Sequence, residues 1–249
     1  MQRYFVNQKQ IETSHIVITG DDVHHIKNVM RLVPGDHIIC CDGTGQEYLV
    51  RIEALDPEKV RGQIEETRRS KGEPAVSVTV SPALLKGDKL DWVLQKGTEL
   101  GAVSFLPFTS QRTIVKLDGK KAVKRRERWQ KIVKEAAEQS RRGRIPEVHP
   151  LSSWEGLLSQ FTHYDRVLFA YEKGGQPLTQ VLEPRRRDIR YLIVLGPEGG
   201  FSETEAEAAQ AQGARIVGLG SRILRAETAS LACLTSILFA HGEIGGEPL

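Results

Sequence analysis

The chain has 249 residues, with 39% hydrophobic and 27% charged side chains and a formal net charge of +3, a composition ordinary for a globular protein of one large domain or two modest ones. No apolar run is long enough to span a bilayer, and the amino-terminal residues lack the apolar core of a signal peptide. Cys40, Cys41 and Cys233 have neither disulfide-framework nor zinc-site spacing, so we expect a cytoplasmic protein that binds no metal.

Residues 1–70 have the pattern of a small β-rich domain. Short strands are predicted at Arg3–Val6, Ile16–Ile18, His37–Cys41, Tyr48–Ile52 and Val60–Ile64. The turn chemistry of Asp42-Gly43-Thr44-Gly45 joins the third and fourth of these strands in a hairpin. A helix capped by Asp21 or Asp22 is expected to run to Met30. Five short strands and one helix favour a small barrel.

The polar segment Arg68–Pro74 contains glycine and proline and marks the predicted boundary between domains at 1–70 and 75–249. Beyond it, short apolar runs alternate with helical patterns, which indicates an α/β domain with a mainly parallel sheet. Strands are predicted at Val76–Val80, Val103–Pro107, Val167–Ala170, Tyr191–Leu195 and Arg215–Leu219. Helices are predicted at Leu90–Leu100, Lys120–Ser140, Trp154–Phe161 and Thr228–His241, and a charged loop at Pro184–Arg190.

Two helix ends and one helix surface carry further signals. Gly101 is a plausible carboxyl-terminal cap for the helix before it. Ser202 with Glu205 three residues later has the form of a capping box, so another helix should begin at Ser202. The last helix is nearly all small and apolar, which indicates burial either in the core or at a subunit interface.

The charge is concentrated in one segment. Between Arg112 and Arg144 there are 13 Lys/Arg and 4 Asp/Glu, a local charge of +9 in a chain whose total is +3. A basic segment on an otherwise acidic protein favours a polyanion such as nucleic acid as the partner. The alternative is a solvated helix face, because charged runs often have no other role.

Glycine-bearing turns follow two of the predicted strands. The first reads L-G-P-E-G-G from Leu195, and the second reads L-G-S-R from Leu219. Ligands of open α/β sheets bind outside the carboxyl ends of the strands, so we predict a pocket lined largely by backbone groups. A tight turn into the next helix would explain one such loop. A second loop, followed by Arg225, Glu227 and Thr228, favours a ligand site.

Other nucleotide and catalytic motifs do not match. The chain has no P-loop and no nucleophile elbow, and it has no His/Cys constellation suited to a metal. Gly218-Leu219-Gly220 begins like a dinucleotide fingerprint but lacks the third glycine. What remains is a backbone-lined pocket in an α/β domain that also carries a basic segment.

Several motifs together resemble one family. These are Q-K-G-T-E-L-G at Gln95–Gly101, E-Q-S-R-R at Glu138–Arg142, L-G-P-E-G-G-F-S at Leu195–Ser202, L-G-S-R-I-L-R-A-E-T-A at Leu219–Ala229 and H-x-x-x-V-M-R at His25–Arg31. In order and setting they resemble the RsmE family, the 16S rRNA uridine N3-methyltransferases of the SPOUT superfamily. The resemblance covers essentially the whole chain. It implies a PUA-like RNA-binding β-barrel at 1–70 and, at 75–249, a methyltransferase domain with a trefoil knot.

The resemblance also implies a cofactor and the residues that bind it. S-adenosylmethionine is expected among Leu195, Gly196, Pro197, Glu198, Gly199, Leu219, Gly220, Ile223, Leu224, Arg225, Thr228 and Ala229, with Phe169, Tyr171 and Glu172 as a third wall. Such a site is physically reasonable, because an adenine ring needs flat apolar walls and glycine lets the backbone approach it closely.

The implied reaction requires an in-line methyl group, loss of the uracil N3 proton, and stabilisation of charge on the uracil carbonyls. Candidate bases are Glu198, Glu99 and Glu227, and candidates for holding carbonyls or phosphate are Arg225, Arg112 and Lys96. We select Glu198, Arg225 and Glu99 as the catalytic residues. A structural ion pair is the alternative role for Glu227.

RNA contacts are predicted at Arg3, Arg31, Lys96, Arg112, Arg125, Arg126, Arg128, Gln139, Arg141 and Arg142. The expected partner is 16S rRNA within the small ribosomal subunit, and the expected assembly is a homodimer. Two alternatives remain. One is a SPOUT methyltransferase that acts on tRNA or on another rRNA nucleotide, and the other is an RNA-binding assembly factor without turnover.

Overall fold

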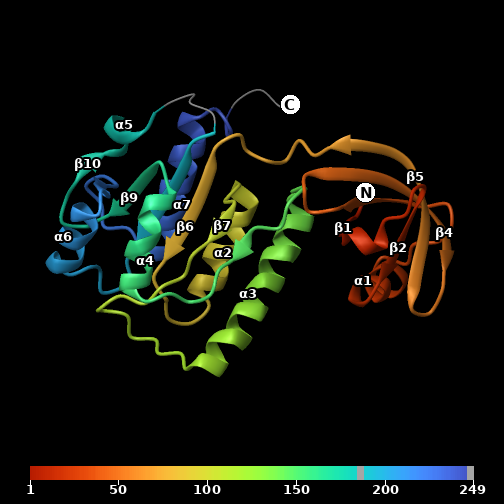
Figure 1. Ribbon diagram of the computed structural model, residues 1–249, viewed down its shortest axis with the longest axis horizontal. Coiled ribbons are helices and arrows are strands. Elements are labelled where there is room, and N and C mark those ends of the chain that lie inside the picture. Colours follow the sequence, from red (N-terminus) through yellow and green to blue (C-terminus); the bar gives the residue numbers. More distant parts are fainter. Residues whose placement is uncertain (184–187, 246–249) are drawn as a thin grey trace. The chain divides into compact units, whose positions relative to one another are not determined.

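The computed structural model describes residues 1–183 and 188–245. The chain forms two compact units, one of residues 1–73 with 137–145 and the other of residues 74–136 with 146–249 (Figure 1). In the described parts of the chain, no helix is both long and apolar enough to cross a membrane. Most of the charged loop predicted at Pro184–Arg190 lies outside the described residues.

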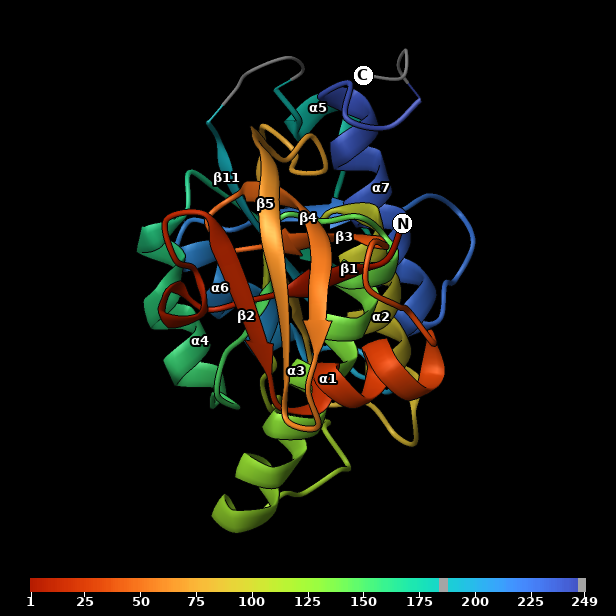
Figure 2. The ribbon, with the colours of Figure 1, turned by 90° about the vertical axis from the view of Figure 1, so that its right-hand side faces the viewer.

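The first unit is built on a curled five-stranded sheet in the order β1-β3-β4-β5-β2 (Figure 2). Its strands are β1 Arg3–Phe5, β2 His15–Thr19, β3 His37–Cys41, β4 Gln46–Leu55 and β5 Lys59–Arg69. The β1–β3 pair is parallel and the other pairs are antiparallel. All five predicted strands are present, and the β3–β4 hairpin is confirmed. Strand β5 is longer than predicted and continues into the first residues of the predicted linker.

The helix of this unit differs from the prediction. It is α-helical over α1 Asp21–His24 and continues as a π-helix, η2 His25–Val29. Neither aspartate is the cap, because Gly20 occupies that position with a φ of 82° that glycine adopts without strain. Asp21 and Asp22 lie in the first turn instead, where carboxylates interact favourably with the helix dipole.

The second unit confirms the predicted parallel α/β fold. Its seven-stranded sheet has the order β10-β12-β9-β11-β6-β7-β8, and every pair is parallel. The strands are β6 Ser77–Pro82, β7 Ser104–Phe105, β8 Glu147–Val148, β9 Arg166–Ala170, β10 Gln176–Pro177, β11 Arg190–Leu195 and β12 Arg215–Gly218. Strand β7 is shorter than predicted. Strands β8 and β10 were not predicted, because two residues are too few to show a period.

Helices cover the central strands of this sheet. The helices of this unit are α2 Lys89–Leu100, α3 Gly119–Gln139, α4 Trp154–Gln160, α5 Leu178–Val181, α6 Glu203–Ala211 and α7 Ala226–Ala240. A 3₁₀ turn, η3 Phe161–His163, follows α4, and another, η1 Gln8–Gln10, lies in the first unit. Helix α7 packs against α2, β6 and β11. Residues of α4 and α6 join a separate core cluster with Leu192 and Val194 of β11. Burial on both sides explains why β11 reads as a continuous apolar run.

Candidate active site

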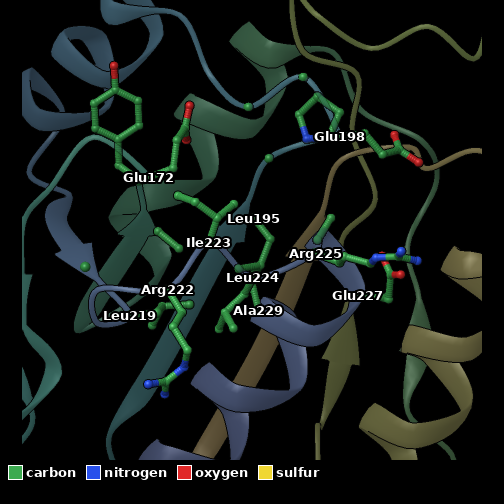
Figure 3. A pocket seen from close by; sticks show the side chains of 18 of the residues that line it. Glu172, Leu195, Glu198, Leu219, Arg222, Ile223, Leu224, Arg225, Glu227 and Ala229 are labelled. Carbon is green, nitrogen blue, oxygen red and sulfur yellow. The ribbon is translucent and has the colours of Figure 1, made fainter.

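A pocket of about 520 Å³ lies where β9, β11 and β12 end (Figure 3). Residues that directly follow these strands line it: Tyr171 and Glu172 after β9, Gly196–Gly200 after β11, and Leu219 with Gly220 after β12. The segment that leads into α7 closes another side. The two glycine turns singled out in the sequence therefore share one cavity at the carboxyl edge of the parallel sheet, where open α/β folds bind ligands.

Nearly all the residues predicted to hold the cofactor line this pocket. They are Tyr171, Glu172, Leu195, Gly196, Pro197, Glu198, Gly199, Leu219, Gly220, Ile223, Leu224, Arg225 and Ala229. Phe169 and Thr228 do not line it. Phe169 is fully buried in the core, with its ring centroid 4.1 Å from that of Phe201, and Thr228 is exposed on α7.

Several lining residues were not among the residues chosen individually as cofactor ligands, although some lie within the predicted loops. They are Lys89, Ala170, Gly174, Gly200, Gly218, Arg222 and Ala226. Most adjoin predicted positions, so a wider window around each strand end would have included them. Lys89 is different, because it begins α2 more than a hundred residues before the glycine loop. No local pattern connects it with the pocket.

Glycine is favoured where the loop after β11 turns back on itself. A Cβ atom at Gly196 would lie 3.0 Å from the ring of Phe201, closer than most side chains pack, so the ring would have to shift. Gly200 has a φ of 66°, and a Cβ there would collide with the Glu172 carboxylate. These two positions let the backbone fold tightly over Phe201 and beside Glu172. Backbone N–H and C=O groups of the loop thereby become part of the pocket wall.

Glu198 ties the glycine loop to the start of α2. Its carboxylate accepts hydrogen bonds from Lys89 Nζ at 2.9 Å and from the Lys86 backbone N–H at 3.1 Å. Partial burial alone would raise the pKa of Glu198, but these donors hold it below the ordinary value. Glu198 is therefore ionised at neutral pH and is a weaker proton acceptor than an ordinary glutamate. The contacts suit an anchor for the loop better than a general base.

Arg112 supports the same loop from another side. Its Nη1 donates to the Gly199 carbonyl oxygen at 2.9 Å, and the backbone N–H of the preceding residue donates to Glu205 Oε1 at 2.8 Å. Glu205 also completes the capping box with Ser202, as predicted. In the structure Arg112 fixes the backbone of a pocket loop, and its predicted contact with RNA stays a prediction.

The other candidate bases differ in position. Glu99 does not line the pocket and instead pairs with Lys96, 2.8 Å away on α2. Glu227 does line it, and its Oε2 atom is buried with no hydrogen-bond partner among the described residues. Arg225, the residue before α7, lines the pocket and is exposed. In Figure 3 the side chains of Arg225 and Glu227 extend from the start of α7 in the same direction.

Two predicted RNA ligands are structural residues of the first unit. The Arg3 side chain is buried, and its Nη1 lies 2.6 Å from Glu47 Oε1. Arg142 is only 2% exposed and pairs with Glu73 at 2.8 Å. A guanidinium that is buried and ion-paired within its own unit would have to give up that pair to contact a phosphate. Arg3 and Arg142 thus have internal partners in place of solvent, which makes them poor candidates for RNA contact.

Three predicted RNA ligands on α3 have partners within the second unit. Arg125 lies over the ring of buried Trp129 at 5.8 Å, and Arg126 Nε donates to a backbone carbonyl of β8 at 2.6 Å. Arg128 pairs with Asp91, which also accepts a hydrogen bond from Trp129 Nε1 at 3.0 Å. These arginines attach α3 to α2 and to the sheet, so their charge is partly compensated.

Lysines of the same helix add further charges that face solvent. Lys120, Lys124 and Lys131 are exposed, and their spacing places them on one face of α3. Of the predicted ligands, Gln139 and Arg141 are exposed beyond them, and Arg31 is exposed in the first unit. Arg31 and Arg141 have φ values of 53° and 61°, which are unusual for residues with a side chain.

The second unit has a parallel α/β sheet with glycine loops around a pocket at its carboxyl edge. The chain also carries a small β-unit and a basic helix. These features together define a two-domain class of nucleotide- or cofactor-binding proteins. Comparison with known families makes this class specific. Residues 72–238 match the model of an RNA methyltransferase domain, and residues 18–65 match that of an RNA methyltransferase PUA domain.

Whole-length relatives carry one name. Ribosomal RNA small subunit methyltransferase E of Bacillus subtilis is 43% identical over 255 residues, covering 99% of this chain and 100% of that protein. The protein of the same name from Mesomycoplasma hyopneumoniae is 32% identical, with coverages of 96% and 99%. The chain belongs to the ribosomal RNA small subunit methyltransferase E family.

A solved structure agrees with this assignment. The Neisseria gonorrhoeae ribosomal RNA small subunit methyltransferase E, crystallised bound to S-adenosyl methionine, superposes with a TM-score of 0.86 at 29% identity. The alignment covers 97% of this chain and 98% of that one. The fold of the gonococcal protein is therefore shared over both units of this chain.

Proposed function

We propose that this protein transfers the methyl group of S-adenosylmethionine to N3 of a uridine in 16S rRNA of the small ribosomal subunit. The observation that carries the proposal is the pocket formed by the glycine loops after β11 and β12, in a chain whose relatives are rRNA methyltransferases. The reaction takes place in the cytoplasm. The first unit, which contains the β-strands of residues 1–70, serves as an RNA-binding domain, and the second unit carries the chemistry.

The lining residues fit S-adenosylmethionine chemically. Leu195, Leu219 and Leu224 offer apolar surface to an adenine ring, and the glycine loop offers backbone donors and acceptors. Charged side chains of both signs, among them Lys89 and Glu172, suit the amino and carboxylate groups of a methionine moiety. When bound, the cofactor supplies a methyl group activated by its positive sulfur. The task of the protein is to hold that group in line with the uracil nitrogen.

Transfer of a methyl group from S-adenosylmethionine to rRNA tests the proposal directly. Incubation with small ribosomal subunits and tritiated S-adenosylmethionine should label 16S rRNA, and nucleoside analysis should identify N3-methyluridine. Label in tRNA, or at another rRNA nucleotide, would support the alternative of a methyltransferase with a different target nucleotide. RNA binding with no label in any RNA would support the assembly factor.

The exposed lysines of α3 are expected to contribute to RNA affinity. Changing Lys120, Lys124 and Lys131 together to glutamate should weaken rRNA binding and reduce the salt slope by about 0.7 for each lost single-strand phosphate contact. Affinity measured from 50 to 200 mM salt checks this. S-adenosylmethionine affinity and the melting temperature should stay unchanged, because these side chains are exposed and do not line the pocket.

The arginines of the same helix provide the comparison. The triple change Arg125→Glu, Arg126→Glu and Arg128→Glu should also lower stability, since it breaks contacts to Trp129, β8 and Asp91. If the lysine variant binds rRNA with its original strength and salt slope, this face of α3 is only solvated. The RNA contact would then have to lie in the first unit.

A homodimer completes the proposal. Ala232, Thr235 and Phe239 recur at helical spacing on a partly uncovered face of α7, and Phe239 is 66% exposed. Such a face of small and apolar residues suits packing against a second copy. We expect Ala232→Arg to give an inactive monomer by sedimentation, whereas Ala211→Arg on the exposed end of α6 should stay dimeric. A fully active wild-type monomer would rule out this assembly.

A further inference from the structure

The carboxylates around the pocket are not equivalent. Glu198 is held by Lys89 and by a backbone N–H, and Glu172 is exposed to solvent. Glu227 Oε2 is buried and has no hydrogen-bond partner within the described chain. A buried carboxylate oxygen is costly unless it accepts a hydrogen bond, so an unpartnered one in a pocket wall indicates that a ligand supplies the donor.

The neighbourhood of Glu227 narrows the choice of donor. Arg225 lies two residues before it, lines the same pocket and is exposed. An acceptor beside a cationic donor is complementary to a ligand edge that presents an N–H next to a carbonyl oxygen. Uracil presents this pattern at N3–H and its flanking carbonyls. Cytosine presents an unprotonated N3 beside an amino group, which is the reverse pattern.

We propose that Glu227 is the general base that removes the N3 proton, and that Glu227 and Arg225 together select uracil over cytosine. This inference rests on the proposed methyl transfer. The N3 proton moves to Glu227 Oε2, and the electron pair of the N–H bond stays on the uracil. Uracil N3 then forms its bond to the methyl carbon as the carbon–sulfur bond breaks, and that electron pair remains on sulfur. The products are N3-methyluridine and S-adenosylhomocysteine, and Glu227 later returns its proton to water.

Arg225 has a separate part in this step. Removal of the N3 proton places negative charge on the two carbonyl oxygens of the uracil. A guanidinium beside the base stabilises that charge as it develops, which is the largest contribution in many active sites. Glu227 itself lies in the first turn of α7, directly after Arg225 and Ala226, so one short segment carries both side chains.

Glu227→Gln keeps the shape of the side chain and removes the base. We expect kcat to fall by about 10²- to 10⁴-fold, the usual contribution of general base catalysis. Calorimetric affinity for S-adenosylhomocysteine and binding of rRNA should be unchanged. The melting temperature should not fall, because Oε2 of Glu227 has no hydrogen-bond partner among the described residues that the change could remove. Glu207→Gln, an exposed position on α6, is the matched control and should behave as wild type.

A substrate with a more acidic N3 proton provides chemical rescue. Small subunits carrying 5-fluorouridine at the target should reduce the Glu227→Gln defect, because fluorine weakens the N3–H bond toward proton loss. A target cytidine should be refused by the wild-type protein and less strictly by Arg225→Gln. An equal defect on uridine and 5-fluorouridine would overturn the inference.

The remaining outcomes are also decisive. Weaker S-adenosylhomocysteine binding by Glu227→Gln would make Glu227 a cofactor ligand, and a lower melting temperature with normal turnover would make it a structural residue. Either result would overturn the inference about Glu227 and leave the proposed methyl transfer intact. Failure of the wild-type protein to methylate any RNA would overturn the proposed function instead.

Discussion

Ala229→Phe is expected to abolish S-adenosylmethionine binding in a protein that remains folded. Ala229 lines the pocket from the first turns of α7 and is only partly buried, so a phenyl ring there can extend into the cavity. A pocket of about 520 Å³ has little room for a nucleoside beside an added aromatic side chain. Calorimetry should show no binding, and methyl transfer should fall below detection.

The matched control is Ala211→Phe, at the exposed carboxyl-terminal end of α6 and away from the pocket. This variant should bind S-adenosylmethionine like the wild type. Replacement of Gly196 by valine is a poorer test, because a Cβ at this position meets the Phe201 ring and disturbs the core. If Ala229→Phe binds the cofactor with unchanged affinity, the cofactor occupies another site.

Glu73→Ala should destabilise the first unit by about 3–5 kcal/mol, the usual effect of removing one partner from a buried ion pair. Glu73 accepts hydrogen bonds from Arg142 Nε at 2.9 Å and Nη2 at 2.8 Å, and from the backbone N–H groups of Gly143 at 2.9 Å and Arg144 at 3.1 Å. The Arg142 side chain is only 3% exposed. Without Glu73 the buried Arg142 guanidinium loses both of these hydrogen bonds, and the backbone N–H groups of Gly143 and Arg144 lose their acceptor.

In chemical denaturation of the whole chain, the unfolding transition of the first unit should occur at a lower denaturant concentration in Glu73→Ala than in the wild type. Glu12→Ala is the control, since Glu12 pairs with Arg61 at 3.9 Å on the exposed surface. Removing an exposed pair should cost no more than about 1 kcal/mol. Equal effects of the two substitutions would show that Glu73 does not hold residues 137–145 in the first unit.

The pocket loops could be predicted from the sequence because their signal is local. Two short apolar runs end in glycine, and the sheet topology places β11 and β12 on either side of β9. Phe169 illustrates the limit of this reasoning. The predicted third wall, from Phe169 to Glu172, begins within strand β9. Successive residues of a strand point to opposite faces, so a wall that begins inside the strand includes a residue whose side chain lies in the core. The contacts of Lys89 and Glu73 depend on the folded chain and have no local pattern.

The basic segment shows a different limit. Its charge of +9 is a property of the sequence, but the division of its arginines and lysines between internal and solvent contacts is not. Trp129, Asp91 and the β8 backbone engage the arginines, and these partners come from three separate segments. A residue count cannot distinguish a guanidinium that packs on Trp129 from one that faces solvent. The trefoil knot implied by the family resemblance stays a prediction.

Mass spectrometry of 16S rRNA from cells that lack this protein is the most direct test of the central claim. We predict that one N3-methyluridine disappears from the rRNA of these cells. The wild-type gene should restore it, and the Ala229→Phe variant should not. Persistence of every N3-methyluridine in 16S rRNA, together with loss of a modification from tRNA or from another nucleotide, would contradict the proposed function.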